Sequence, residues 1–433
     1  MLKLAWFILV FSPIAVFAQD SGPAVLSRGE VPGTDRPDLS FRPFLEAAWT
    51  YGTSVSELGV DSEGGRIGSS GIQISAGLSG AHSWRKTTLG LGYRGSIDHY
   101  AKAGNYNSYD QSLQLSLSQQ LTRHAVLTLK ESAGMFSRNF GLSGEALSFG
   151  SVSSGSMIGL FDRKMEYLES EADLTLQASN RLSFSLGAQG NLTRRRTTGL
   201  YGVTGGGANA DVQYRASRRS TFGLNYSYNY FAYRGVKSNT SMHGLAGTYS
   251  VKLSRSLEFS ILGGALRSEN FTSQDIRLDP IMAWLFGTST VTAVSYHVDY
   301  VPNVSARLSE AFRHANFSLS GGRTVTPGNG LFLTSIATNV YAGYEYTGLR
   351  RWSLGLEAGY SRNKSIGNVV GYYGNLSAGG SMARQIARYV HAVASVECRR
   401  YDSSSFQRYN RLDYYARVGL AFAPGDAPLR LWP

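Results

Sequence analysis

The sequence of 433 residues is poor in cysteine and in charge. Its one cysteine, Cys398, excludes an intrachain disulfide framework and any zinc site built from several cysteines. Charged residues make up 17% of the chain, against about 25% in an ordinary soluble domain, which excludes a highly charged disordered protein and a charged helical solenoid. After residues 1–18, the longest strongly apolar run is 281–286, far too short for a helix that crosses a bilayer.

Glycine and aromatic residues are abundant instead. Glycine supplies 50 of the 433 residues, about 12%, against about 7% in average proteins, and the chain also has 26 tyrosines. This composition favours strands over helices. The formal net charge of +12 is spread along the chain rather than gathered in a block, so we expect no nucleic-acid partner.

The first 18 residues resemble a secretory signal. Lys3 supplies the charged start, residues 4–16 are apolar, and Val16 and Ala18 precede a cleavage point before Gln19. The alternative is a membrane anchor, but the apolar run is shorter than the roughly 20 residues that a spanning helix needs. We therefore predict a signal peptide over 1–18, followed by a flexible periplasmic tail over 19–40.

From residue 41 to 422, apolar and small polar residues alternate with period two. In the segment 70–81, for example, Ile72 and Ile74 fall on one face while Gln73 and Ser75 fall on the other. Each segment has the roughly 9–11 residues that a tilted strand needs to cross a bilayer core. We count 18 such segments: 41–53, 70–81, 87–98, 110–121, 125–136, 166–178, 182–193, 207–216, 220–233, 240–253, 257–267, 295–309, 315–324, 335–346, 352–362, 373–383, 389–400 and 411–422.

The connections between these segments alternate between short and long. All eight short ones contain an arginine, which can pair with lipid phosphates at the headgroup layer or can simply solubilise a turn. The long ones are polar and glycine-rich, and we assign the run Gly202 to Gly207 to one of them. Bacterial transmembrane barrels have even strand numbers, short periplasmic turns and longer extracellular loops. The short connections are 82–86, 121–124, 179–181, 217–219, 254–256, 313–314, 349–351 and 384–388; the long ones include 54–69, 137–165, 194–206, 268–294 and 325–334.

A soluble fold is the alternative for such a pattern. A propeller repeats every ~40–45 residues but packs four short strands into that length, whereas this chain has two long ones. A soluble sandwich has the same period, so strand length and turn asymmetry decide against it. Aromatic residues near the strand ends fit the interfacial girdles of a barrel: Trp49, Tyr51, Trp84, Tyr100, Tyr228, Tyr230, Tyr344, Tyr346, Trp352, Tyr389, Tyr414 and Phe422.

On these features the chain resembles a bacterial outer-membrane β-barrel of the porin-like kind. The resemblance covers residues 41–422 and rests on the signal peptide, the alternating strands and stretches such as 115–123 and 326–330. It implies an all-β, antiparallel, up-and-down transmembrane barrel of about 18 strands (16–18) in the outer membrane, with membrane lipids and the barrel-insertion machinery as partners. Barrels of this kind often end on an aromatic residue, whereas here a tail over 423–433 follows Phe422. Either Phe422 is read internally as the insertion signal, or the tail, with Trp432, serves instead.

A barrel of this size leaves an aqueous lumen whose lining sets selectivity. The alternation turns three carboxylates, Glu169, Glu171 and Asp173, inward on one strand. Facing cations would create a transverse field that filters polar solutes; the alternative is that the charges form structural bridges or hydrate a wide lumen. The candidate cations on inward positions are Arg94, Arg195, Arg215 and Arg307.

Segment 268–294 is the candidate for a constriction or rim loop. Asp279 can cap a helix, and the apolar run with Trp284 and Phe286 would be unusual in a fully exposed loop. It either folds into the barrel or covers the rim. Segment 137–165 is a second candidate for this role.

No catalytic motif is present. No His-Glu-x-x-His pair, Gly-x-Ser-x-Gly elbow or phosphate-binding loop occurs, so we expect neither an enzyme nor a bound cofactor or metal. We expect a channel for passive diffusion of small hydrophilic solutes. The alternatives are an export pore for a polysaccharide or other polymer, and a closed barrel with a structural or surface-interaction role.

Overall fold

The computed structural model describes residues 40–53, 68–101, 107–136, 164–196, 200–277, 289–328, 333–366, 371–404, 410–424 and 427–428. Within these ranges all regular structure is β-strand. The strands are β1 (Ser40–Gly52), β2 (Ser69–Ser83), β3 (Thr87–Tyr100), β4 (Ser108–Gln120), β5 (Ala125–Phe136), β6 (Met165–Gln177), β7 (Leu182–Arg195), β8 (Gly202–Arg215), β9 (Ser220–Arg234), β10 (Lys237–Lys252), β11 (Leu257–Arg277), β12 (Thr290–Ala311), β13 (Ala315–Thr326), β14 (Ser335–Tyr346), β15 (Trp352–Ser365), β16 (Tyr372–Gln385), β17 (Val390–Ser403), β18 (Arg411–Phe422) and the two-residue β19 (Ala427–Pro428).

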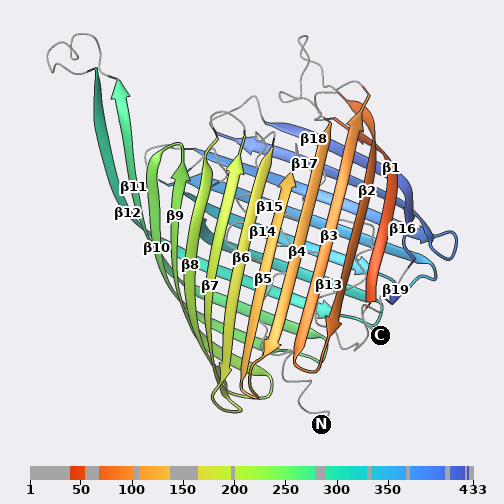
Figure 1. Ribbon diagram of the computed structural model, residues 1–433, viewed down its shortest axis with the longest axis horizontal. Helices are drawn as coiled ribbons and strands as arrows, with labels where there is room; N and C mark the ends of the chain where they lie inside the picture. Colours follow the sequence, from red (N-terminus) through yellow and green to blue (C-terminus); the bar gives the residue numbers. More distant parts are fainter. Residues whose placement is uncertain are drawn as a thin grey trace.

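The sheet closes on itself (Figure 1). Each strand from β1 to β18 pairs antiparallel with its neighbours in sequence, and β1 pairs with both β2 and β18. The closing pair joins Leu45 to Phe422 and Gly52 to Tyr415. The predicted 18-stranded, antiparallel, up-and-down barrel is therefore confirmed. In addition, β19 returns to pair with the start of β1, at Ser40 and Phe41.

The two ends of the barrel differ. Eight short turns join β2 to β3, β4 to β5 and so on to β16–β17, and we call this the turn end. The other connections lie at the opposite, loop end. One of these is also tight: residues 235–236 join β9 to β10, and Gly235 has a φ of 88°. A two-residue hairpin of this type needs positive φ at its first position, which glycine adopts without steric cost.

The two faces of the wall differ as well. On the outer face of β9, the side chains of Phe222, Leu224 and Tyr226 are 51%, 54% and 45% exposed. On the inner face of β1, Glu46 and Thr50 are 1% and 0% exposed. Large apolar residues thus face away from the barrel while polar ones face into it, the reverse of a soluble protein's arrangement. Among the described residues no helix is long and apolar enough to cross a membrane.

Three details of the sequence interpretation are wrong. The glycine-rich run from Gly202 is part of β8 and not a loop. A Cβ on Gly205 would clash with the Phe231 ring, so glycine makes room for an inward aromatic side chain. Residues 268–277 and 290–294 are strand and not loop, because the antiparallel pairing of β11 with β12 continues as far as Arg277 and Thr290. Tyr100 lies on the inner face, 5% exposed, and is not part of an outer girdle.

Candidate functional site: the barrel interior

The predicted acidic strip lies along β6. Glu169 and Asp173 are buried on its inner face, and Glu171 lies between them. Lys130, from the inner face of β5, contacts the strip, with its Nζ 3.4 Å from a carboxylate oxygen of Glu171. Our predicted set did not include Lys130, although the alternation along β5 turns Leu127 and Leu129 outward and therefore turns Lys130 inward. The strip is thus partly compensated by its neighbouring strand.

Amide side chains continue this polar lining across β7, β8 and β9. The Asn209 and Asn225 amides donate to the two carboxylate oxygens of Asp211, at 3.1 and 2.6 Å. The Gln189 amide donates to Asn229 at 2.6 Å. The Asn209–Asp211 bond lies within β8, and the other two cross between strands, so this part of the inner face carries a connected set of polar groups.

The four predicted arginines are spread over the barrel. Arg94 of β3 lies 5.8 Å from the Phe44 ring centroid. Arg215 donates to the backbone oxygens of Ser217 and Arg218 in its own turn, at 3.3 and 3.4 Å. Arg195 ends β7 at the loop end, and Arg307 lies on β12, between Ser260 and Ser320 in register. They differ in height and in position around the wall, so these four do not form one strip.

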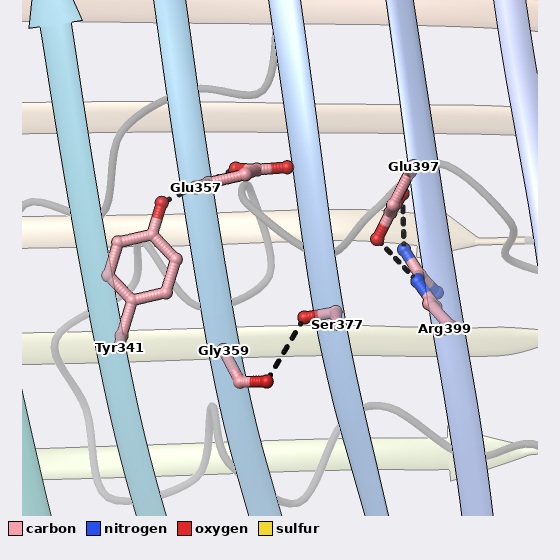
Figure 2. A network of polar contacts seen from close by, with 6 residues as sticks. All are labelled: Tyr341, Glu357, Gly359, Ser377, Glu397 and Arg399. Atoms are coloured by element: carbon pink, nitrogen blue, oxygen red, sulfur yellow. Dashed lines mark hydrogen bonds and ion pairs between the residues drawn. The ribbon is translucent and has the colours of Figure 1, made fainter.

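A second charged network lies on β14, β15 and β17 (Figure 2). Arg399 contacts Glu397 on the same strand through two bonds, from Nε to Oε1 at 2.5 Å and from Nη2 to Oε2 at 3.1 Å. Both side chains are nearly buried, 6% and 11% exposed. The Tyr341 hydroxyl donates to Glu357 at 3.4 Å. A two-bond contact of this kind is geometrically specific, which fixes the direction of both charges.

The closing seam carries a further buried pair. Arg417 of β18 lies 3.4 Å from a carboxylate oxygen of Glu46 on β1, and it donates to Gln73 of β2 at 3.2 Å. On β3, Asp98 accepts a hydrogen bond of 2.7 Å from Ser108 of β4. The sequence analysis selected one acidic strip and four inward arginines and did not include these residues. The inward phase of each strand, applied throughout, would have found them.

One segment of the wall folds into the interior. The β12–β13 pairing ends at Val304–Arg323, beyond which β12 continues with β11 as a ribbon that projects from the barrel (Figure 1). Val325 and Ile336 lie at the loop ends of β13 and β14. By the alternation along each strand they should face outward, as Leu319 and Val340 do. Yet they pack against inner-face residues of β8 to β12, and Val325 is fully buried. The inner-face residues of this cluster are Val203, Phe231, Tyr233, Met242, Leu266 and Val301.

Hydrogen bonds hold the same segment. The Thr334 hydroxyl lies 2.8 Å from the Tyr233 hydroxyl and 2.7 Å from that of Thr240. Leu333 and Ile366 add apolar contact to the cluster. We call Val325, Leu333, Thr334 and Ile336 the folded-in end of β13 and β14. It lies at the loop end, against the inner face of β8 to β12.

The predicted constriction residues Asp279, Trp284 and Phe286 lie outside the described residues, as do the signal peptide and most of segment 137–165. The structure does bring the folded-in end into the interior. Our sequence analysis placed Val325, Leu333 and Thr334 in the long connection 325–334 and Ile336 in the strand 335–346. Among the described residues, no group of three or more His, Cys, Asp or Glu side chains is arranged to hold a metal ion.

No known family's sequence profile and no curated protein matches the chain. Solved structures with a similar shape include Pseudomonas aeruginosa OccK2 (OpdF) in complex with glucuronate, with 10% identity and a TM-score of 0.43 over 90% of this chain and 98% of that one. The siderophore receptor PirA from Pseudomonas aeruginosa has 12% identity and a TM-score of 0.39 over 90% and 81%. The FrpB iron transporter from Neisseria meningitidis has 11% identity and a TM-score of 0.40 over 86% and 65%. At these scores the likeness carries no assignment of function.

Proposed function

We propose that this chain is an outer-membrane channel for the passive diffusion of small hydrophilic solutes. The single observation that carries the proposal is the division of the wall into an apolar outer face and a polar inner face. On the turn-end side of the Val304–Arg323 pair the closed wall leaves no unpaired strand edge, so its backbone groups can be satisfied inside a bilayer. The partners would be the surrounding lipids and the machinery that inserts barrels into the outer membrane.

The turn end fits the headgroup layer of a membrane. Its arginines are exposed, and two of them stack on outer-face aromatic side chains: Arg384 over Trp352 and Arg388 over Tyr389, each at 5.1 Å. An aromatic ring at the interface with a cation beyond it matches the girdle of a transmembrane barrel. We assign the turn end to the periplasm and the loop end to the cell exterior.

The folded-in end supports small solutes over a polymer. It places apolar and hydroxyl side chains inside the bore at the loop end, where an export pore for a polysaccharide would need full width. In the remaining lining, the Lys130 and Glu171 side chains of the acidic strip are 34% and 41% exposed and offer charged groups to a hydrated solute. Such groups orient small solutes as they pass.

The test is conductance in planar bilayers, with localisation as its companion. Purified protein that runs heat-modifiably on gels should form stable, ohmic pores, and vesicles containing it should admit small sugars up to a sharp size limit. Folded protein that conducts no ions would instead indicate a closed barrel. Loss of a surface polymer on gene deletion, with unchanged solute uptake, would favour export, and recovery in the soluble periplasmic fraction would refute the membrane assignment.

A further inference from the structure

A pocket rich in arginine lies at the loop end of β6 to β9. It has a volume of about 330 Å³, and its lining includes Glu166, Arg194, Arg195, Arg196, Leu200 and Arg234. We call it the rim pocket. Four guanidinium groups face one carboxylate there, so the lining has a net excess of three positive charges.

The position of these arginines on the wall is specific. Arg194 shares the outer-face phase of Leu192 on β7, and Arg234 shares that of Tyr230 on β9. Both are exposed, and both come directly after the last apolar outer-face residues of their strands on the loop side. In a bilayer this is the height of the headgroups in the exterior leaflet.

The pocket is held by contacts on its margin. The Arg196 Nη2 lies 2.9 Å from Glu166 Oε1, and these side chains are 64% and 29% exposed. The Arg234 Nε donates to the Thr204 hydroxyl on β8 at 3.3 Å. Glu166 thus pairs with Arg196, and the exposed Arg194 and Arg234 side chains bring positive charge to the outer-face side of the pocket.

We propose that the rim pocket binds the phosphate groups of an anionic lipid in the exterior leaflet. Arginine presents a planar fork of donors that matches phosphate, and several forks converge here. A lipid has its apolar chains and its phosphate at adjacent heights, as the wall has Leu192 and Tyr230 beside Arg194 and Arg234. A free phosphate ion would use the arginines but not this apolar surface, so we assign the site to the lipid.

The inference rests on the membrane location in the proposed function and not on conduction. A barrel that binds lipid but conducts no ions would refute the channel and leave this site intact. A barrel that conducts ions but does not bind the lipid selectively would refute this site and leave the channel proposal intact.

The experiment measures binding of bisphosphorylated lipid A to the full chain in neutral detergent micelles, by a fluorescent analogue and by native mass spectrometry. The test variant is R194Q/R234Q. The matched control, R362Q/R400Q, removes the same charge from exposed outer-face positions of β15 and β17, which do not line the rim pocket. We expect at least tenfold weaker binding for the test variant, an intermediate loss for R194K/R234K, and an unchanged constant for the control.

Two further probes separate the sources of phosphate. Dephosphorylated lipid A should bind at least tenfold more weakly than the bisphosphorylated form, and inorganic phosphate at equal concentration should not displace it. Equal affinity of the test and control variants, with heat-modifiable mobility retained in both, would overturn the site. Displacement by inorganic phosphate would overturn the assignment to lipid.

Discussion

Two substitutions at the folded-in end of β13 and β14 should widen the bore. Val325→Ala removes two buried carbons from a fully buried side chain, about 1.6 kcal/mol at ~0.8 kcal/mol per carbon, before any cavity cost. Tyr233→Phe removes the hydroxyl 2.8 Å from Thr334, about 1 kcal/mol. If the two effects add, the double variant loses about 2.6 kcal/mol of the free energy that holds the folded-in end in place, which is a roughly 80-fold shift toward the released segment.

The assay is single-channel conductance, together with the size limit for sugars that enter vesicles. We expect a larger or flickering conductance state and a higher size limit for V325A/Y233F. The control is Val393→Ala, which removes the same two carbons from a buried inner-face cluster at the turn end. In a C398S background, T240C/T334C should form a disulfide that suppresses the flicker, since the two hydroxyl oxygens lie 2.7 Å apart. If the double variant conducts like both the control and the unmodified protein, the folded-in end does not narrow the path.

The remaining predictions concern charge, orientation and turn geometry. Arg399→Met leaves Glu397 unpaired in a nearly buried position, so we expect a loss of about 3–5 kcal/mol in the free energy of unfolding and a reversal potential shifted toward cations. The double variant E397Q/R399M should restore most of the unfolding free energy and most of the reversal potential. Equal values for the single and the double variant would contradict the pairing. Leu115→Lys on the outer face should cost about 2–4 kcal/mol in urea titrations of the protein folded in vesicles, whereas the adjacent inner-face Ser116→Lys should cost little; equal costs would mean that the faces are misassigned. Gly235→Val should cost about 1–2 kcal/mol in the same titration because valine resists positive φ, and Gly235→Asn should cost less; an unchanged value for valine would refute the turn assignment.

The strands were predictable because one face of each must be apolar. That constraint imposes period two on the sequence, and the segments 125–136, 335–346 and 411–422 match β5, β14 and β18 residue for residue. The prediction was wrong where the constraint is relaxed. Residues 268–273 of β11, beyond the wall, are polar on both faces except for Phe271, and their sequence therefore resembles a loop. The start of β8 is glycine-rich because inward side chains from neighbouring strands fill its space.

Contacts between strands distant in sequence were not predictable in the same way. The phase of each strand indicates that Glu169 and Asp173 point inward, but not that Lys130 reaches Glu171. Thr334 contacts Tyr233 and Thr240 across about a hundred residues of chain, and no periodicity encodes that pairing.

The sequence by itself determined the strands, their number, their order and the face that each turns outward, since all of these follow from a local alternation repeated along the chain. The tertiary structure decided what occupies the interior. Closure of the sheet brings β1 beside β18 and forms the Glu46–Arg417 pair, and separation of β12 from β13 lets the folded-in end reach the inner face of β8 to β12. Charged residues are scarce in this chain, and the fold decides where they lie. Exposed arginines lie at both ends of the wall, and paired carboxylates lie on its inner face.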